Sequence, residues 1–320
     1  MNFSIVIPTY NRARMLYDTL QLLSCVHYRK NKYEIVIVDN NSSDNTHKVT
    51  HEFKYNHPEL SIRYVFEKKQ GRSFACNTGC RVAQYYHIIF LDDDVRVNKN
   101  ILIIYRNIYK SYSQASVIGG KILAKLNIPI ISRKNSFLLD LPSSYRWIFG
   151  EYDIGNKRKI LKYPQVLFSA NISVNLHKLN NPKVVFNENL GRKFNNGYLY
   201  AEDCELCLRL LLEKHQIIYE PLLVVKNIID IDRLNFRYLI RRHVFAGVEK
   251  FVIDQQLKDY PKHVPYSIAI DIRTIVSSFK HIRFMRRIFW IDQICEACFI
   301  FGYFVLSRIF FKRTFYSKIL

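Results

Sequence analysis

The stretch Tyr86-His87-Ile88-Ile89-Phe90-Leu91-Asp92-Asp93-Asp94-Val95 joins an apolar run to three adjacent carboxylates. The apolar run is typical of a buried parallel strand, and the charged triplet marks its end. Neighbouring carboxylates repel one another, so a fold retains them chiefly where a cation or the hydroxyls of a substrate offset their charge. Hard oxygen ligands in a row favour Mg²⁺ or Mn²⁺ bridging phosphate oxygens. A solvated acidic turn explains the triplet alone equally well.

Three further apolar runs precede this stretch, at residues 3–8, 33–38 and 62–66, and helical patterns cover residues 15–23 and 73–83. Strands that alternate with helices and are hydrophobic on both faces predict an α/β fold with a doubly wound, mostly parallel sheet. In such a sheet, ligands bind beyond the carboxyl ends of the strands. The residues expected to meet at this edge are Pro8 to Arg12, Asp39, Gly71 with Arg72, and Asp92 to Asp94.

A second acidic cluster, Glu202-Asp203, opens a helical pattern that continues through residues 206–211. Acidic residues in the first turn of a helix are favoured by the helix dipole, so capping alone explains the cluster. A carboxylate held at a helix start beside a ligand site can also act as a general base that takes a proton from a hydroxyl. The residues leave both explanations open.

The 320 residues include 48 Lys and Arg against 27 Asp and Glu, a formal net charge of +21. This charge attracts polyanions in general: nucleic acid, an anionic membrane or a nucleotide diphosphate. No recognised nucleic-acid module accompanies it, so no nucleic-acid partner is expected. The seven cysteines are odd in number and lie in helical or apolar stretches, which favours free thiols in a reducing compartment. The first residues lack the basic segment of a signal peptide, so a cytoplasmic location is expected.

From Arg233 onward the composition becomes basic and aromatic, and two domains, 1–232 and 233–320, are expected. Within the apolar residues 288–311, the uncharged core 297–307 is far shorter than the roughly 20 residues that span a bilayer. We therefore expect a helical appendage that lies peripherally on the anionic inner face of the cell membrane. Packing on the first domain and a dimer interface are the alternatives. The polar residues on one stripe of this helix are Asp292, Glu296, Tyr303 and Ser307.

Five blocks occur in one order along the chain: Ser4 to Arg12, Val36 to Asp44, Gly71 to Gly79, Phe90 to Asp94, and Glu202-Asp203. In this combination the chain resembles the family-2 glycosyltransferases of the GT-A fold over roughly its first 230 residues. The resemblance implies inverting transfer of a sugar from a nucleotide diphosphate sugar to a hydroxyl of a glycan or lipid-linked acceptor, in surface polysaccharide synthesis. It also implies Mg²⁺ or Mn²⁺ as the cofactor.

The resemblance further implies roles for individual residues. Asp39 would hydrogen-bond the base, Asp92 would meet the ribose or the sugar, and Asp94 would coordinate the metal. Asp203 would be the catalytic base, with Glu202 beside it and Arg209 as a charge partner of the cluster. The implied nucleotide-sugar site comprises Pro8, Thr9, Tyr10, Arg12, Asp39, Gly71, Arg72, Asn77, Asp92, Asp93 and Asn171, the last in a Ser169-Ala170-Asn171 segment that would face the donor sugar and the acceptor.

Two positions depart from the family pattern. Cys76, rather than an arginine, precedes Asn77, and Arg72 is a candidate for the missing charge. Residues 221–227, after the last expected strand, include no histidine that would complete a metal shell. Lys226 in that stretch is a hypothetical partner of the phosphates.

Three other functions stay open at this point. A nucleotidyltransferase would need a glycine-rich loop after the first strand, where the chain reads Pro8-Thr9-Tyr10-Asn11-Arg12. A basic nucleic-acid-binding protein would account for the charge, and a catalytically degenerate transferase-like scaffold would account for the two departures. Specificity is expected to lie in residues 124–163 and in the loop before Glu202.

Overall fold

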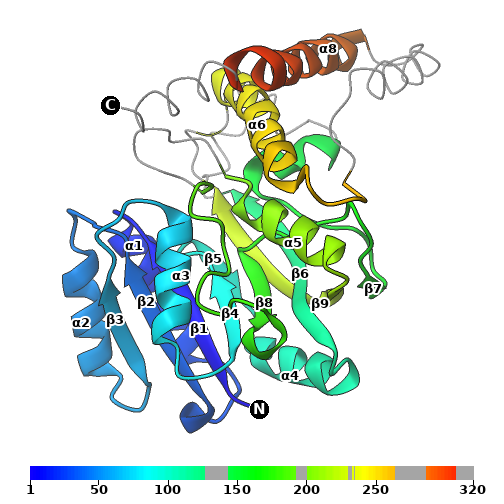
Figure 1. Ribbon diagram of the computed structural model, residues 1–320. Coiled ribbons are helices and arrows are strands. Elements are labelled where there is room, and N and C mark those ends of the chain that lie inside the picture. The colour runs from blue at the N-terminus through cyan, green and yellow to red at the C-terminus, as the bar shows by residue number, and fades with distance from the viewer. Residues whose placement is uncertain (127–142, 192–199, 230–232, 234, 264–285, 308–320) are drawn as a thin grey trace, which may run out of the picture. The chain divides into compact units, whose positions relative to one another are not determined.

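The computed structural model describes residues 1–126, 143–191, 200–229, 233, 235–263 and 286–307 (Figure 1). The chain divides into two compact units. The first comprises Met1–Asn127, Phe149–Gly197 and Glu202–Ile229, and the second comprises Ile128–Ile148, Tyr198–Ala201 and Asp230–Leu320.

A mixed sheet with the strand order β3-β2-β1-β4-β8-β6-β9-β5 forms the centre of the first unit, and β7 pairs with β9. Its first four strands are parallel, as predicted, and are joined by helices. These elements are β1 (Phe3–Thr9), α1 (Ala13–Ser24), β2 (Tyr33–Asp39), α2 (Thr46–Asn56), β3 (Ile62–Phe66), α3 (Arg72–Val82) and β4 (His87–Leu91), with a 3-10 turn η1 (Lys30–Lys32) before β2.

The other half of the sheet mixes strand directions. Of the eight strand pairings between described residues, four are antiparallel: β8 runs against both β4 and β6, and β5 and β7 run against β9. The α/β fold class is confirmed, and the parallel character is confined to the first strands and to β6 with β9. The elements here are β5 (Val95–Val97), α4 (Ile101–Ser111), β6 (Ala115–Leu126), η4 (Ser143–Phe149), β7 (Lys159–Ile160), β8 (Asn171–Asn175), η5 (Leu176–Lys178), α5 (Glu202–Leu212) and β9 (Gln216–Ile229).

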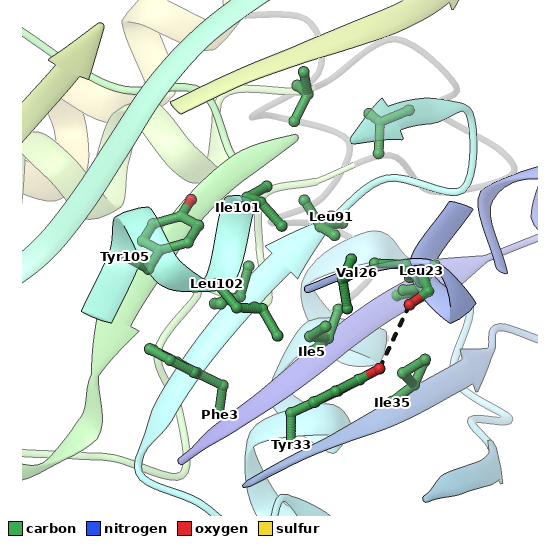
Figure 2. Packing of buried hydrophobic residues seen from close by; sticks show 14 of the residues in the cluster. Phe3, Ile5, Leu23, Val26, Tyr33, Ile35, Leu91, Ile101, Leu102 and Tyr105 are labelled. Atoms are coloured by element: carbon green, nitrogen blue, oxygen red, sulfur yellow. Dashed lines mark hydrogen bonds between the residues drawn. The ribbon is translucent and has the colours of Figure 1, made fainter. Parts of the chain in front are cut away.

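The sheet is buried on both faces, which explains why its strands are continuously apolar. Successive residues of β1 point to opposite sides: Ile5 and Ile7 pack in one cluster, and Val6 packs in the other. Figure 2 shows the first cluster, in which α1 and α4 contribute Leu23 and Tyr105 over the strands. Each fully buried side chain of this size contributes about 1.5–3 kcal/mol. This core fixes the strand ends that carry the polar residues.

The second unit contains α6 (Phe236–Leu257), α8 (Arg286–Phe301) and a π-helical turn, η9 (Gly302–Leu306), that continues α8. α6 packs against both α8 and η9. A Cβ added at Gly247 of α6 would lie 2.0 Å from the carbonyl oxygen of Phe299, so the two backbones are in direct contact. None of the helices in the described part of the chain combines the length and the apolar character needed to cross a bilayer. The helices α6 and α8, which both follow residue 233, confirm the expected helical appendage.

Candidate active site

The acidic triplet lies directly after β4, beside the end of β1 (Figure 1). Thr9 of β1 donates its hydroxyl to Asp93 Oδ2 at 2.8 Å, and the Thr19 hydroxyl of α1 donates to the carbonyl oxygen of Asp93 at 2.7 Å. Asp93 and Asp94 are both buried. Burial raises the pKa of Asp93 to about 6, against the opposing charge of Arg12. The triplet is thus an ordered and largely desolvated group, not a solvated acidic turn.

Arg12 offsets the charge of two members of the triplet. Its Nη1 lies 3.1 Å from Asp93 Oδ1 and 2.6 Å from Asp94 Oδ2. Arg12 stands immediately before α1, so the loop after β1 supplies the cation that three carboxylates require. Three of the residues predicted for the nucleotide and metal site, Arg12, Asp93 and Asp94, therefore meet.

Arg72, the first residue of α3, connects the two acidic clusters. Its Nη2 donates to Asp92 Oδ1 at 2.5 Å and its Nη1 donates to Glu202 Oε1 at 3.0 Å. Cys76 lies one helical turn further along and is fully buried, and burial raises the pKa of its thiol to about 12. Residues 110 positions apart in sequence, Asp92 and Glu202, therefore lie within the reach of one guanidinium group.

Asp203 is held at the start of α5 by hydrogen bonds to both carboxylate oxygens. Oδ2 accepts the backbone N–H of Ser169 at 2.9 Å and its hydroxyl at 3.1 Å, and Oδ1 accepts the N–H of Cys204 at 2.8 Å. Asp203 remains half-buried. Arg209 pairs with Glu205 at 2.8 Å, so it balances the third acidic residue of this helix start.

Glu202 differs from Asp203 in its environment. It is buried, and this burial raises the pKa of its carboxyl to about 8 although Arg72 opposes the shift. Its second oxygen, Oε2, is buried without a hydrogen-bond partner among the residues that the structure describes. A carboxyl with this pKa holds a proton for most of the time at neutral pH.

Two asparagines to which the sequence analysis assigned no individual role link the loops that follow β1, β2 and β3. Asn11, with a positive φ of 52°, accepts the N–H of Ser43 at 2.7 Å. Asn40 accepts the N–H of Gly71 at 2.8 Å, and its amide donates to the carbonyl of Lys69 at 2.7 Å. Asparagine is among the few residues that tolerate positive φ, so Asn11 in the loop after β1 suits the backbone there.

Asp39 ends β2 and is buried at the same edge of the sheet. It accepts the N–H of Ser42 and the hydroxyl of Tyr64, each at 2.8 Å. Tyr64 belongs to β3 and was not predicted as a site residue. Tyr10 follows β1 in the adjoining loop and is partly exposed.

The remaining predicted site residues serve the frame of the site. The Asn77 amide exchanges hydrogen bonds with the backbone of Phe186, at 2.8 and 2.9 Å. The Asn171 side chain accepts the Tyr105 hydroxyl at 3.0 Å and donates to the carbonyls of Lys121 and Leu223. Pro8 lies inside β1, Gly71 precedes α3 with a φ of 146°, and Lys226 is exposed on β9.

Within the described ranges, no three His, Cys, Asp or Glu side chains converge as a ligand set for a metal ion. The backbone at Asp94 is fixed by β9, because its carbonyl accepts the N–H of Ile228 at 3.0 Å. Asp94 thus presents one carboxylate, in contact with Arg12, at the edge where the predicted metal would lie.

Comparisons with known proteins give a family match for the first part of the chain. Residues 4–138 match the family model for glycosyl transferase family 2. Chondroitin synthase of Escherichia coli is 38% identical over 97 residues, which are 30% of this chain and 14% of that protein. Glycosyltransferase AglE of Haloferax volcanii is 34% identical over 91 residues, 28% of this chain and 30% of the relative. The matches therefore span less than a third of the length of either relative.

Two solved structures share the fold. A mannosyltransferase from Pyrobaculum calidifontis, in complex with GDP-Man and Mn²⁺, matches with a TM-score of 0.61 and 16% identity over 95% of this chain and 87% of its own. TarS of S. aureus, residues 1-349 with UDP-GlcNAc, matches with a TM-score of 0.58 and 16% identity over 82% of this chain and 68% of its own. Residues 4–138 therefore resemble glycosyl transferase family 2, and the chain has the fold of these two solved glycosyltransferases.

Proposed function

We propose that the protein is an inverting glycosyltransferase that moves a sugar from a nucleotide diphosphate sugar to a hydroxyl of a glycan or lipid-linked acceptor, in surface polysaccharide synthesis. The observation that carries this proposal is the Arg72 bridge, which brings the acidic triplet and the Glu202-Asp203 pair to one place. A transferase needs a donor site and a general base that are separated by no more than the length of one sugar. The UDP-GlcNAc and GDP-Man bound by TarS and the mannosyltransferase support a sugar nucleotide as donor.

The donor half of the site would use the loops joined by Asn11 and Asn40. Asp39, oriented by Ser42 and Tyr64, would accept a hydrogen bond from the base. Arg12 lies beside Asp93 and Asp94 and would face the diphosphate as a fixed positive charge.

Asp94 would hold a divalent cation, Mg²⁺ or Mn²⁺. The carboxylate of Asp94 is a suitable ligand for such an ion. Mg²⁺ is commonly bound by one or two carboxylates together with substrate phosphates, so a cage of three protein ligands is not required. The bound ion would supply Lewis-acid stabilisation of the departing diphosphate. Arg12, which contacts Asp94 at 2.6 Å, would share that carboxylate with the ion or turn toward the phosphates.

Asp203 is the better general base of the acidic pair. Glu202, with a pKa raised to about 8 by burial, is mostly protonated at neutral pH and cannot accept a second proton. Asp203 is half-exposed, and Ser169 fixes its orientation through two hydrogen bonds. It would take the proton of the acceptor hydroxyl while that oxygen attacks the anomeric carbon from the side opposite the diphosphate.

The test is a pair of variants assayed with a panel of sugar nucleotides. Asp203→Asn should abolish transfer and keep donor affinity, since it removes the base and retains a hydrogen-bonding side chain. Asp94→Ala should weaken donor binding only when Mg²⁺ or Mn²⁺ is present. Asp259→Asn, at an exposed site in the second unit, is the control. Normal turnover in Asp203→Asn would sink the assignment of the base.

We also propose a division of labour within the chain: residues 1–232 bind the donor and catalyse transfer, and residues 233–320 attach the enzyme to the inner face of the cell membrane. The second stretch holds 16 Lys and Arg against 6 Asp and Glu, which favours anionic lipid. Removal of residues 288–320 should release the protein from the membrane fraction of cells. A truncated protein that stays with the membrane would contradict this division.

A further inference from the structure

Two polar residues of the C-terminal helix, Tyr303 and Ser307, face the interior of the second unit. Tyr303 and Ser307 are buried, and the Tyr303 hydroxyl donates to Asp254 Oδ2 of α6 at 2.9 Å. Asp254 is itself only 3% exposed and is also paired with Lys250 and His263. The Tyr303 end of the stripe is therefore covered by α6.

The outer side of the same helix is apolar. Ile294, Phe301 and Val305 are 40%, 48% and 45% exposed. Steps of seven and four residues place these three side chains on one helical face. A helix on the surface of a water-soluble domain places its apolar stripe inward and its polar stripe outward. The C-terminal helix reverses this order, because the polar Tyr303 and Ser307 are buried while the apolar Phe301 and Val305 are exposed.

The contact between α6 and the C-terminal helix includes close backbone approach at two glycines. A Cβ at Gly302 would lie 1.8 Å from the carbonyl oxygen of Val244, and Gly247 is packed as closely against Phe299. Close backbone contact at glycines, together with buried hydrogen bonds, holds helices together where the surroundings are themselves apolar.

The net charge of residues 233–320 favours one kind of partner. Residues 233–320 carry 16 Lys and Arg against 6 Asp and Glu, and Arg237, Lys258 and Lys262 are exposed in the described part. A second copy of the chain would bring the same positive charge and be repelled. An anionic bilayer supplies both the negative charge and an apolar layer beneath it.

We propose that Ile294, Phe301 and Val305 form a membrane-contact face that inserts into the boundary between the head groups and acyl chains of an anionic bilayer, with α8 and η9 lying in the membrane plane. The polar stripe is satisfied by α6 instead of water. This inference deepens the membrane part of the proposed function and is independent of the transfer reaction.

The experiment uses the full-length chain and sedimentation with vesicles of phosphatidylglycerol and phosphatidylcholine, or of phosphatidylcholine alone. Phe301→Glu combined with Val305→Glu should lower the partition coefficient on the anionic vesicles roughly tenfold or more, since each change removes part of an apolar contact. Ile294→Gln alone is a milder second variant. Leu222→Glu in the first unit, at a side chain that is 67% exposed, is the matched control and should bind as the unchanged protein does.

Donor binding, followed by thermal shift with a sugar nucleotide, should be the same in all variants, which separates this test from that of the transferase assignment. Binding of the unchanged protein should weaken as salt rises and should be poorer on neutral vesicles. Equal vesicle binding by the variants and the unchanged protein, or no vesicle binding at all, would overturn the proposal. A dimer that dissociates in the variants, seen by light scattering, would assign the face to a second copy instead.

Discussion

Replacement of Arg72 by methionine tests the connection between the two acidic clusters. The change removes the guanidinium that bonds Asp92 at 2.5 Å and Glu202 at 3.0 Å and keeps a side chain of similar length. Asp92 is partly exposed and can regain water, whereas Glu202 is buried and cannot. The loss of a buried ionic partner typically costs about 3–5 kcal/mol.

The expected cost here is lower. Burial already raises the pKa of Glu202 to about 8, so without Arg72 the carboxyl can stay protonated at pH 7 and avoids an unpaired charge. The loss then reduces to the charged hydrogen bond with Asp92, about 1.5–3 kcal/mol. We expect the melting temperature to fall by roughly 3–10 °C. Transfer should fall further, by about 100-fold, since a misplacement of about 1 Å in a reacting group has that effect.

A second substitution makes this prediction specific. Position 76 lies four residues after Arg72 in α3 and so on the same helical face, and its side chain is close enough to feel the charges of Asp92, Glu202 and Asp203. In the Arg72→Met background, Cys76→Arg should therefore restore at least about a tenth of the lost kcat/KM. This recovery is expected if a positive charge close to the two acidic clusters is what transfer requires.

The assay is steady-state transfer, with the melting temperature recorded for every variant. Arg81→Met is the control, because Arg81 lies at the far end of α3 and pairs only loosely, at 3.7 Å, with Glu67. Transfer by Arg72→Met within threefold of the unchanged enzyme would refute the role of the bridge. A folded double variant without any recovery would refute the view that positions 72 and 76 serve the same carboxylates.

Three further predictions concern Glu202 of the acidic pair, the nucleotide site and the second unit. Burial raises the pKa of Glu202 from 4.5 in the unfolded chain to about 8 in the folded protein, so the contribution of the protonated carboxyl to stability is complete below pH 4.5 and is lost as the pH rises through 8. Glu202→Gln should therefore flatten the fall of the melting temperature between these pH values. The same dependence of melting temperature on pH in the variant and the unchanged protein would contradict this. Tyr64→Phe removes the hydroxyl that orients Asp39 and should weaken nucleotide binding by about three- to tenfold in calorimetry, with unchanged affinity as the contrary result. Gly302→Val forces a Cβ against Val244 and should make the second unit sensitive to limited proteolysis while donor binding persists; equal resistance would show that the helices can separate without cost.

The sequence predicts the first part of the fold well for a physical reason. Strands β1 to β4 are buried on both faces, so their apolar runs are long and end sharply at polar residues. Strand β8 shows the limit of the same argument. Residues 166–174 have a strand-like pattern, yet the strand begins only at Asn171, because Leu167 bonds Cys207 and Ser169 bonds Asp203. Contacts with α5 outweigh the local preference.

In the site, the local sequence likewise reveals the chemistry of single residues but not the contacts between them. The chemistry of Asp39, Asp92 to Asp94 and Asp203 is visible because charged residues follow apolar strands or open a helix. Which carboxylates Arg12 and Arg72 contact is not visible, because these arginines come from loops and helix starts whose direction depends on the whole sheet. For the C-terminal helix, periodicity reveals a polar stripe but not which side is covered, and α6 decides that.

The arrangement of charge at the site supports a role for a divalent cation. Arg12 and Arg72 provide two positive charges beside Asp92, Asp93 and Asp94 and the Glu202-Asp203 pair. With Glu202 protonated, since its pKa is raised to about 8, the four aspartates exceed the two arginines by two negative charges at neutral pH. An approaching diphosphate would meet this excess as repulsion. One divalent ion at Asp94 would cancel it, whereas a monovalent ion would leave the site negative. Removal of divalent ions should therefore weaken donor binding more than it weakens binding of the free nucleoside, and equal loss for both ligands would argue against this electrostatic account.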